Sequence, residues 1–215
     1  MIKFHHTFKT LPSIFHSPSV AIHFSNPKLI HFNHQLSQEL GLDFSFYSEE
    51  DLAKIFTGNL VLNGIEPISL AYAGHQFGHF VPQLGDGRAM LLGEIIDSHG
   101  KRFDIQLKGM GPTKFSRNGD GKSALGPVIR EYLLSEAMHE LGVPTTRALA
   151  AVSTGDFVYR ETALPGAVFT RIASSHLRIG TFQYASAQGD TSSLKAHFDY
   201  AILRHYPEIK NQENT

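Results

Sequence analysis

The sequence predicts an α+β fold in which an antiparallel sheet carries one long helix. Residues 102–108 alternate between apolar and polar side chains, as a strand with one buried face does. The apolar run 89–96 predicts a neighbouring strand, and the turn-forming residues 97–100 predict a hairpin between the two. Residues 128–141 carry apolar side chains at helical spacing, and Gly142 is suited to end that helix.

The composition is that of an ordinary globular chain. Its 215 residues are enough for one domain with a real core, and 41% of them are hydrophobic. The net charge of −1 indicates no general attraction to nucleic acid or to a membrane surface, and no apolar run is long enough to span a bilayer. The absence of cysteine fits a reducing compartment, so we expect a cytoplasmic protein. The 13 histidines are scattered, and we expect no zinc site from them.

The first 70 residues are expected to form an extension with a packing or docking role. An apolar stripe predicts a helix over 27–41, ended by Gly41, and Ser48 followed by acidic residues predicts the start of a second helix. Beyond it, residues 68–80 predict a strand and a tight turn. We expect that turn to be stacked by three aromatic side chains, Tyr72, Phe77 and Phe80.

The second half predicts more sheet and another helix. Strands are expected over 145–153, 157–161 and 167–173, separated by turns at Thr154-Gly155-Asp156 and Leu164-Pro165-Gly166. The helix 128–141 is expected to start with Pro127 in its first position, and its apolar stripe consists of Ile129, Leu133, Leu134, Ala137, Met138 and Leu141. A last helix is predicted over 192–206.

A candidate anion site begins at a glycine turn. Gly85 and Gly87 flank Asp86 and precede Arg88. Glycine has no Cβ and tolerates positive φ, so such a turn is expected to leave backbone N–H groups uncovered for a bound anion. The strand alternation places Lys108 on the polar face, where it can reach into a cleft.

The order of elements matches the small lobe of a protein kinase: glycine turn, strand, hairpin, strand with lysine, helix with glutamate. In that arrangement Glu131 meets Lys108, although the spacing alone favours a solvent-facing glutamate paired with Ser135 or Arg130. Arg171 and Arg178 lie either side of a predicted bend. They could clamp one polyphosphate, or be ordinary surface arginines.

The polar loop 109–126 is too long for a simple connection. It fits no common phosphate loop. A Walker motif needs glycine where Ser116 stands, and a dinucleotide fingerprint needs glycine at Met90. The loop is therefore either a solvated surface loop or part of a different kind of nucleotide site.

Longer motifs give a specific resemblance. They are Ala71-Tyr72-Ala73-Gly74-His75-Gln76-Phe77-Gly78, Gln83-Leu84-Gly85-Asp86-Gly87-Arg88-Ala89, Gln106-Leu107-Lys108-Gly109, Gly111-Pro112-Thr113, Ser116-Arg117, Gly119-Asp120-Gly121 and Arg130-Glu131. With them the chain resembles the selenoprotein O family, pseudokinases that transfer AMP from ATP to protein hydroxyls. The resemblance extends from about residue 8 to about residue 207. Family members are much longer, so the chain resembles their N-terminal part.

The resemblance implies a function and a site. It implies an ATP-dependent protein adenylyltransferase that modifies Ser, Thr or Tyr hydroxyls, with ATP and Mg²⁺ as cofactors. From the charge and the lack of a long apolar run, we expect no nucleic-acid or membrane partner. The ATP-binding residues it implies are Gly85, Gly87, Arg88, Lys108, Asp120, Gly121, Arg171 and Arg178, with Glu131 positioning the lysine. The catalytic base and the metal ligands are expected beyond Thr215, so no catalytic or metal-binding residue is expected within this chain.

Three regions follow from this resemblance: an extension over 1–70, a kinase-like small lobe with the nucleotide site over 71–185, and the start of a helical lobe over 186–215, most of which is missing. The chain alone is expected to bind ATP weakly and to be inactive. The alternatives are a lobe of a phosphate-transferring kinase, a non-catalytic nucleotide-binding or docking fragment, and a histidine-based metal module.

Overall fold

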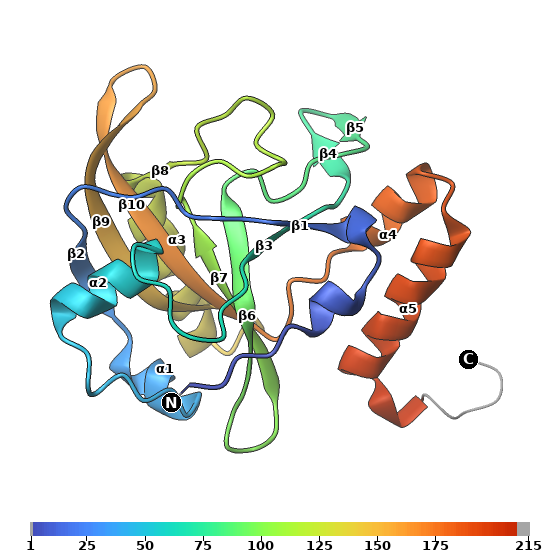
Figure 1. Ribbon diagram of the computed structural model, residues 1–215, viewed down its shortest axis with the longest axis horizontal. Helices are drawn as coiled ribbons and strands as arrows, with labels where there is room; N and C mark the ends of the chain where they lie inside the picture. The colour runs from blue at the N-terminus through green and yellow to red at the C-terminus, as the bar shows by residue number, and fades with distance from the viewer. Residues whose placement is uncertain (1, 210–215) are drawn as a thin grey trace.

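The fold, a computed structural model that describes residues 2–209, is built on an eight-stranded antiparallel sheet (Figure 1). The strand order is β1-β3-β6-β7-β10-β9-β2, and β8 pairs with β10. The strands are β1 (His16–Pro18), β2 (Lys28–Phe32), β3 (Ile68–Leu70), β6 (Ala89–Ile96), β7 (Arg102–Lys108), β8 (Ser123–Ala124), β9 (Arg147–Tyr159) and β10 (Ala163–Ala173). Two further strands, β4 (Gly74–Gln76) and β5 (His79–Val81), form a separate hairpin. The predicted mixed α and β architecture with an antiparallel sheet is confirmed.

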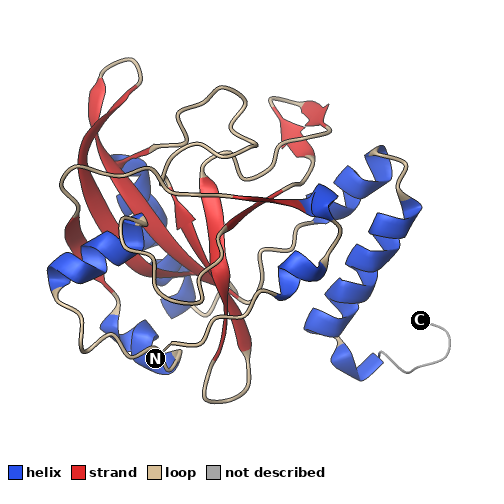
Figure 2. Cartoon of the chain, viewed as in Figure 1, coloured by secondary structure: helices blue, strands red, loops and turns tan. Residues whose placement is uncertain are grey.

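Helices cover both faces of the sheet (Figures 1 and 2). On one face, α1 (His34–Glu39) and α2 (Glu49–Thr57) pack onto β6, β7, β9 and β10 and enclose the largest hydrophobic core. On the other face, α3 (Leu125–Glu140) packs onto β9 and β10. The residues of β7 that point away from the main core are therefore on the α3 side, and this side carries the polar groups described below.

A third layer joins the two ends of the chain. The helices α4 (Ile179–Ala187) and α5 (Thr191–His205) pack with the N-terminal turns η1 (Thr7–Thr10) and η2 (Ser13–Phe15), and a short turn η3 (Pro207–Ile209) follows. Phe8, Phe15 and Tyr184 are buried between them. The helix predicted over 192–206 is confirmed as α5, whereas the sequence analysis did not predict α4.

The single helix predicted over 27–41 is wrong in its first half. Lys28–Phe32 is strand β2, paired with β9, and α1 begins only after Asn33, whose side chain accepts a hydrogen bond from the N–H of Leu36 at 2.9 Å. Phe32 stacks on Phe56 of α2 with ring centroids 5.5 Å apart. The apolar residues of this stretch fit the two-residue period of a strand as well as the 3.6-residue period of a helix. The same pattern is therefore compatible with a strand followed by a helix and with one longer helix. The second helix is confirmed as α2, with Ser48 in a capping box.

The three strands predicted over 145–173 are in fact two long ones. The supposed turn 154–156 lies inside β9, where Gly155 takes φ = +78°, and the supposed turn 164–166 lies inside β10 next to a register shift. A Cβ on Gly166 would lie 2.6 Å from Thr154 Oγ1. Both glycines therefore allow a local irregularity within one continuous hairpin, and neither forms a turn between separate strands. The real turn lies between Tyr159 and Ala163.

Two details of helix and turn packing also differ from the predictions. The predicted stripe of α3 faces outward: Leu133 and Leu134 are 61% and 57% exposed, while Val128 and Tyr132 are buried against the small side chains of the sheet. The helix begins at Leu125, which places Pro127 third. The expected aromatic stack at 72–80 is wrong as well, because Phe77 is 98% exposed at the tip of the β4–β5 hairpin.

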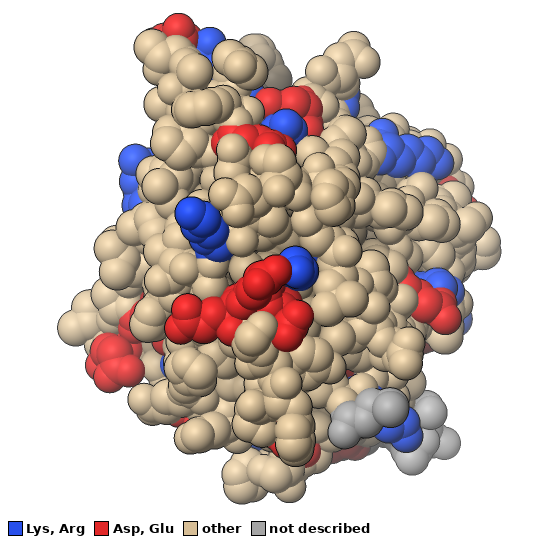
Figure 3. Space-filling model, turned by 60° about the vertical axis from the view of Figure 1, so that its left-hand side comes forward, with Lys and Arg blue, Asp and Glu red and all other residues tan. Residues whose placement is uncertain are grey.

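One face of the molecule carries few charged side chains. Figure 3 shows a face that is mostly uncharged, with acidic groups gathered near its middle and basic groups beside them. This agrees with the near balance of 19 basic and 20 acidic residues in the sequence. Among residues 2–209, no helix combines the length and the apolar character that crossing a membrane requires.

Candidate functional site

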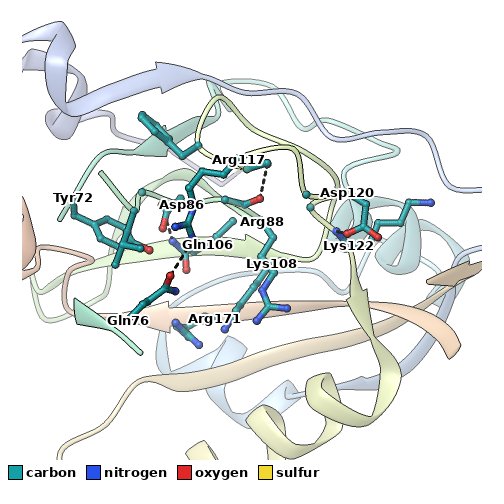
Figure 4. Close-up of a pocket in the computed structure, with 18 of the residues that line it drawn as sticks. Tyr72, Gln76, Asp86, Arg88, Gln106, Lys108, Arg117, Asp120, Lys122 and Arg171 are labelled. Carbon is teal, nitrogen blue, oxygen red and sulfur yellow. Dashed lines mark hydrogen bonds between the residues drawn. The ribbon is translucent and has the colours of Figure 1, made fainter. Parts of the chain in front are cut away.

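One pocket brings together the residues that the sequence marked. It has a volume of about 440 Å³ and lies between the glycine turn, β7, β10 and the loop that follows β7. All eight predicted ATP-binding residues line it: Gly85, Gly87, Arg88, Lys108, Asp120, Gly121, Arg171 and Arg178. Figure 4 shows Tyr72 and Asp86 toward one end of this space and Asp120 and Lys122 at the other, with Arg88, Lys108 and Arg171 between them.

A carboxylate links two of the cations. Glu131 of α3 binds Lys108 of β7 through one oxygen and the Arg171 guanidinium of β10 through the other, the latter at 2.5 Å. Phe169 and Lys108 are direct partners across the two strands, so Arg171 lies two residues along the neighbouring strand on the same face. The alternative in which Glu131 faces solvent and pairs locally is therefore wrong, since its side chain points into the sheet.

The electrostatics of this cluster are dominated by an excess of cations. Burial, together with the charges of Arg171 and Arg88, lowers the pKa of Lys108 despite its bond to Glu131. Burial alone would raise the pKa of Glu131, but Lys108 and Arg171 outweigh it, so that pKa lies below its ordinary value. Seven basic and two acidic side chains line the pocket. An uncompensated positive field of this kind attracts an anion of high charge.

Arg178 reaches the pocket from the segment before α4. Its guanidinium carbon lies 4.7 Å from the centre of the Tyr72 ring, a cation–π contact. The Nε atoms of Arg178 and of Arg171 are both buried, and neither has a hydrogen-bond partner among residues 2–209. Buried donors without partners are costly, so these two groups provide a ready-made place for acceptor oxygens.

The glycine turn does not offer free amides, contrary to the expectation. The N–H groups of Gly85 and Asp86 donate to the backbone oxygens of Tyr72 and Leu70 at 3.0 and 2.8 Å, and that of Gly87 donates to Gly85 O at 3.0 Å. The glycines are required for packing instead. A Cβ on Gly85 would lie 2.4 Å from Cγ of Phe115, and Gly85 also has φ = +67°.

The loop after β7 is tied down rather than loosely solvated. Thr113 and Ser116 donate to the backbone oxygens of Asp86 and Gly87, each at 2.6 Å. Phe115 is buried beneath the turn. A Cβ on Gly121 would overlap the carbonyl oxygen of Gly111 at 1.9 Å, so this glycine allows two backbone segments to touch.

The pocket is also lined by polar residues that were not among the predicted eight, including Arg160, Gln106, Asp86 and Tyr72. Arg160, in the β9–β10 turn, binds both carboxylate oxygens of Asp120 at 2.8 and 3.0 Å, and this pairing lowers the pKa of Asp120. Gln106 is 1% exposed and donates to the Asp86 carboxylate at 3.3 Å, while its own oxygen has no described partner. Burial raises the pKa of Asp86, and Tyr72 lies beside it with its pKa raised by burial to about 12. Polar residues buried at the wall of a pocket are a signal that only the fold supplies.

The same residues do not suit Mg²⁺. The carboxylates at the site, on Asp86, Asp120 and Glu131, are all bound by donors of the chain itself. The described part of the chain holds no group of three or more histidine, aspartate or glutamate side chains placed to hold a metal ion. His75 lies on the β4–β5 hairpin against Phe80, with ring centroids 5.4 Å apart, and does not line the pocket.

The chain is similar to known proteins along its whole length. It matches the family model described as "Protein adenylyltransferase SelO" over residues 1–215. It is 61% identical over 213 residues to the protein nucleotidyltransferase YdiU of Rhizobium rhizogenes (strain K84), covering 99% of this chain and 42% of the relative. The corresponding protein of Agrobacterium fabrum is 57% identical over 214 residues, which is 100% of this chain and 44% of that relative. The corresponding protein of Rhizobium meliloti is 59% identical over 211 residues, which is 98% of this chain and 43% of that relative.

The chain thus spans less than half the length of the curated relatives it matches. The match runs through the pocket-lining residues as well as the scaffold, since it includes nearly every position of the chain. By sequence over its full length, the chain belongs to the SelO protein adenylyltransferase family.

Proposed function

We propose that this chain is the ATP-binding part of a protein adenylyltransferase. The observation that carries the proposal is the cluster of Lys108, Glu131 and Arg171 in a 440 Å³ pocket, next to two buried arginine Nε donors without described partners. Such a site fits a triphosphate, which brings several acceptor oxygens and a high negative charge. The names of the relatives, protein nucleotidyltransferases, support the same reading.

The proposed roles follow from position. Arg88, Lys108, Arg171 and Arg178 would bind phosphate oxygens, and Glu131 would hold Lys108 and Arg171 in place. Asp120, Gly85, Gly87 and Gly121 would contact the nucleotide from the turn and the loop. The sheet with α3 corresponds in this proposal to a kinase-like small lobe over 71–185, preceded by an extension over 1–70 and followed by the start of a helical lobe over 186–215. We place the protein in the cytoplasm.

The chemistry proposed for the whole protein is adenylyl transfer. The oxygen of a protein Ser, Thr or Tyr hydroxyl forms a bond to the α-phosphorus while its proton passes to a base, the bond from that phosphorus to the bridging oxygen breaks, and pyrophosphate leaves. The cations of the pocket would offset the charge on the phosphates. The base and the Mg²⁺ ligands would come from the part of the relatives that this chain does not match. The chain alone is then expected to bind ATP weakly and to transfer nothing.

Two measurements test this proposal. ATP should raise the melting temperature of the chain, because a ligand that binds only the folded state stabilises it. A protein extended to the relatives' full length should transfer label to protein from α-labelled ATP but not from γ-labelled ATP, with Mg²⁺ present. Label from γ-labelled ATP would instead identify a phosphate-transferring kinase. No thermal shift and no label in either form would favour a docking fragment.

A further inference from the structure

The polar face of β7 extends beyond the candidate site to a second buried cluster. Along this face Gln106 contacts Asp86 and Lys108 contacts Glu131, while Asp104 lies one step further from the pocket. Asp104 is 5% exposed. None of the proposed ATP contacts uses it, so its partners need a separate explanation.

Asp104 binds the segment that leads to Arg178. One of its carboxylate oxygens accepts from the backbone N–H of His176 at 2.7 Å and lies 3.2 Å from that residue's ring Nδ1. Burial alone would raise the pKa of Asp104, but His176 and Arg204 outweigh it, so this carboxyl is held ionised. The His176 side chain is only 3% exposed and lies two residues before Arg178.

Helix α5 holds this cluster from behind. Arg204 donates to the other oxygen of Asp104 at 2.5 Å, to the backbone oxygen of Ser174 at 2.6 Å and to Glu94 at 3.0 Å. On the far side of Arg178, the N–H of Ala73 donates to the backbone oxygen of Gly180 at 2.8 Å. The segment that carries Arg178 is thus fixed at both ends, by Asp104 with His176 before it and by Gly180 after it.

We infer that His176 is a positioning residue: with Asp104 and Arg204 it sets the backbone before Arg178, so that the Arg178 guanidinium lies over Tyr72 in the pocket. The phosphate-binding role of Arg178 rests on the proposed function, whereas its placement by His176 does not. Without the His176 side chain, the backbone N–H of residue 176, the Arg204–Ser174 bond and the Gly180 contact remain, so the chain still folds. An apolar side chain would then face the buried Asp104 carboxylate in place of the ring nitrogen, the backbone before Arg178 would shift away from it, and the Arg178 guanidinium would leave its position over Tyr72.

Side-chain NMR of arginine tests the placement without any nucleotide. The Nε–Hε signal of Arg178, assigned with Arg178→Lys, should be displaced by the Tyr72 ring, and Tyr72→Leu should remove that displacement. His176→Leu should remove it too. His176→Asn should keep it, because the amide can still donate to Asp104. The matched control is His197→Leu, an equally buried histidine that packs on Phe182 of α4 and has no described hydrogen-bond partner, and it should leave the signal unchanged.

Nucleotide binding gives the second readout. His176→Leu should weaken ATP binding about tenfold, the scale of one lost charge-assisted hydrogen bond, and should cause no further loss in an Arg178→Met background. An unchanged Arg178 signal in His176→Leu, or losses that add in the double variant, would overturn the inference. If His176→Leu removes the displacement of the Arg178 signal by the Tyr72 ring but leaves ATP affinity unchanged, the positioning role of His176 is supported. The same result would contradict the proposed role of Arg178 in binding phosphate.

Discussion

Arg160 and Asp120 form a two-point ion pair, with nitrogen–oxygen distances of 2.8 and 3.0 Å, between the turn of the β9–β10 hairpin and the loop after β7. Both residues line the pocket, and both are partly exposed. The pair therefore closes the outer end of the pocket and connects two segments that are distant in sequence. It also adds a cation that the sequence did not mark.

Arg160→Gln is expected to weaken ATP binding by roughly 3- to 10-fold. The change removes one positive charge from the pocket wall and frees the Asp120 loop, and exposed pairs of this kind contribute on the order of 1 kcal/mol. Isothermal titration calorimetry at low and high salt is the measurement. The matched control is Arg130→Gln, an exposed arginine of α3 that does not line the pocket. Equal effects of the two variants would remove Arg160 from the site.

Lys108→Ala is expected to abolish the thermal stabilisation by ATP. Lys108 is one of the cations at the centre of the pocket, and its loss leaves Glu131 facing the phosphates with Arg171 alone. His75→Ala, on the exposed β4–β5 hairpin, should reduce the stabilisation far less. The comparison uses melting temperatures with and without ATP. A similar loss in both variants would contradict the assignment of Lys108 to the nucleotide site.

Gly85→Ala should destabilise the fold more than Gly41→Ala, by roughly 1–3 kcal/mol, the usual cost of overpacking. Both glycines have φ = +67°, so the conformational cost of a side chain is the same in the two. Only at Gly85 would the new Cβ collide with Phe115, since Gly41 has no atom within 4 Å of that position. Urea unfolding of the two variants measures the difference. Equal destabilisation would show that the turn can move away from Phe115.

His197→Leu should flatten the acid side of the stability profile. Burial lowers the pKa of His197 to about 4, from an ordinary 6.5, so its neutral form is favoured by folding. The contribution of His197 to the free energy of unfolding is therefore complete above pH 6.5. It is lost as the pH drops from 6.5 toward 4. The variant should lose this part of the fall, on the order of 2 kcal/mol. Urea unfolding at pH 7.5 and at pH 4.5 checks it, and identical pH dependence would contradict the prediction.

The sequence predicts well those elements whose signals are local. The alternation of residues 102–108, the capping residue Ser48 and the apolar spacing of residues 192–206 are of this kind, and each element is present. Which face of α3 is buried cannot be predicted from the helix residues alone, because it depends on the part of the sheet against which the helix packs. Its partners on the sheet are alanines such as Ala148 and Ala151, so two larger side chains fill the contact and Leu133 is left outside. Residues 28–32 likewise become a strand only because β9 is there to pair with them.

The candidate site divides in the same way. Four cations, on predicted strands, beside the glycine turn or flanking a predicted bend, could be proposed together with four turn and loop residues, and the fold brings all eight into one pocket. Arg160 could not, because nothing in the residues around it points to the loop after β7, and it meets Asp120 of that loop only in the folded chain. The prediction about the glycine turn was wrong for a similar reason. Its composition suggested free amides, but the backbone of Leu70 and Tyr72, some 15 residues earlier, accepts from them.

The contacts of Glu94 make the stability of the sheet depend on the first residues of the chain. This carboxylate is 1% exposed and accepts from Thr7 at 2.7 Å and from the N–H of Phe8 at 3.1 Å, while the backbone of His5 pairs with Glu94 on both sides. Loss of residues 1–8 would leave the Glu94 carboxylate with its arginine partners Arg102 and Arg204 but without these two donors, at a cost of roughly 1.5–3 kcal/mol for each hydrogen bond to the charged group. Losing them would thus raise the fraction of unfolded chains, the form that proteases cut.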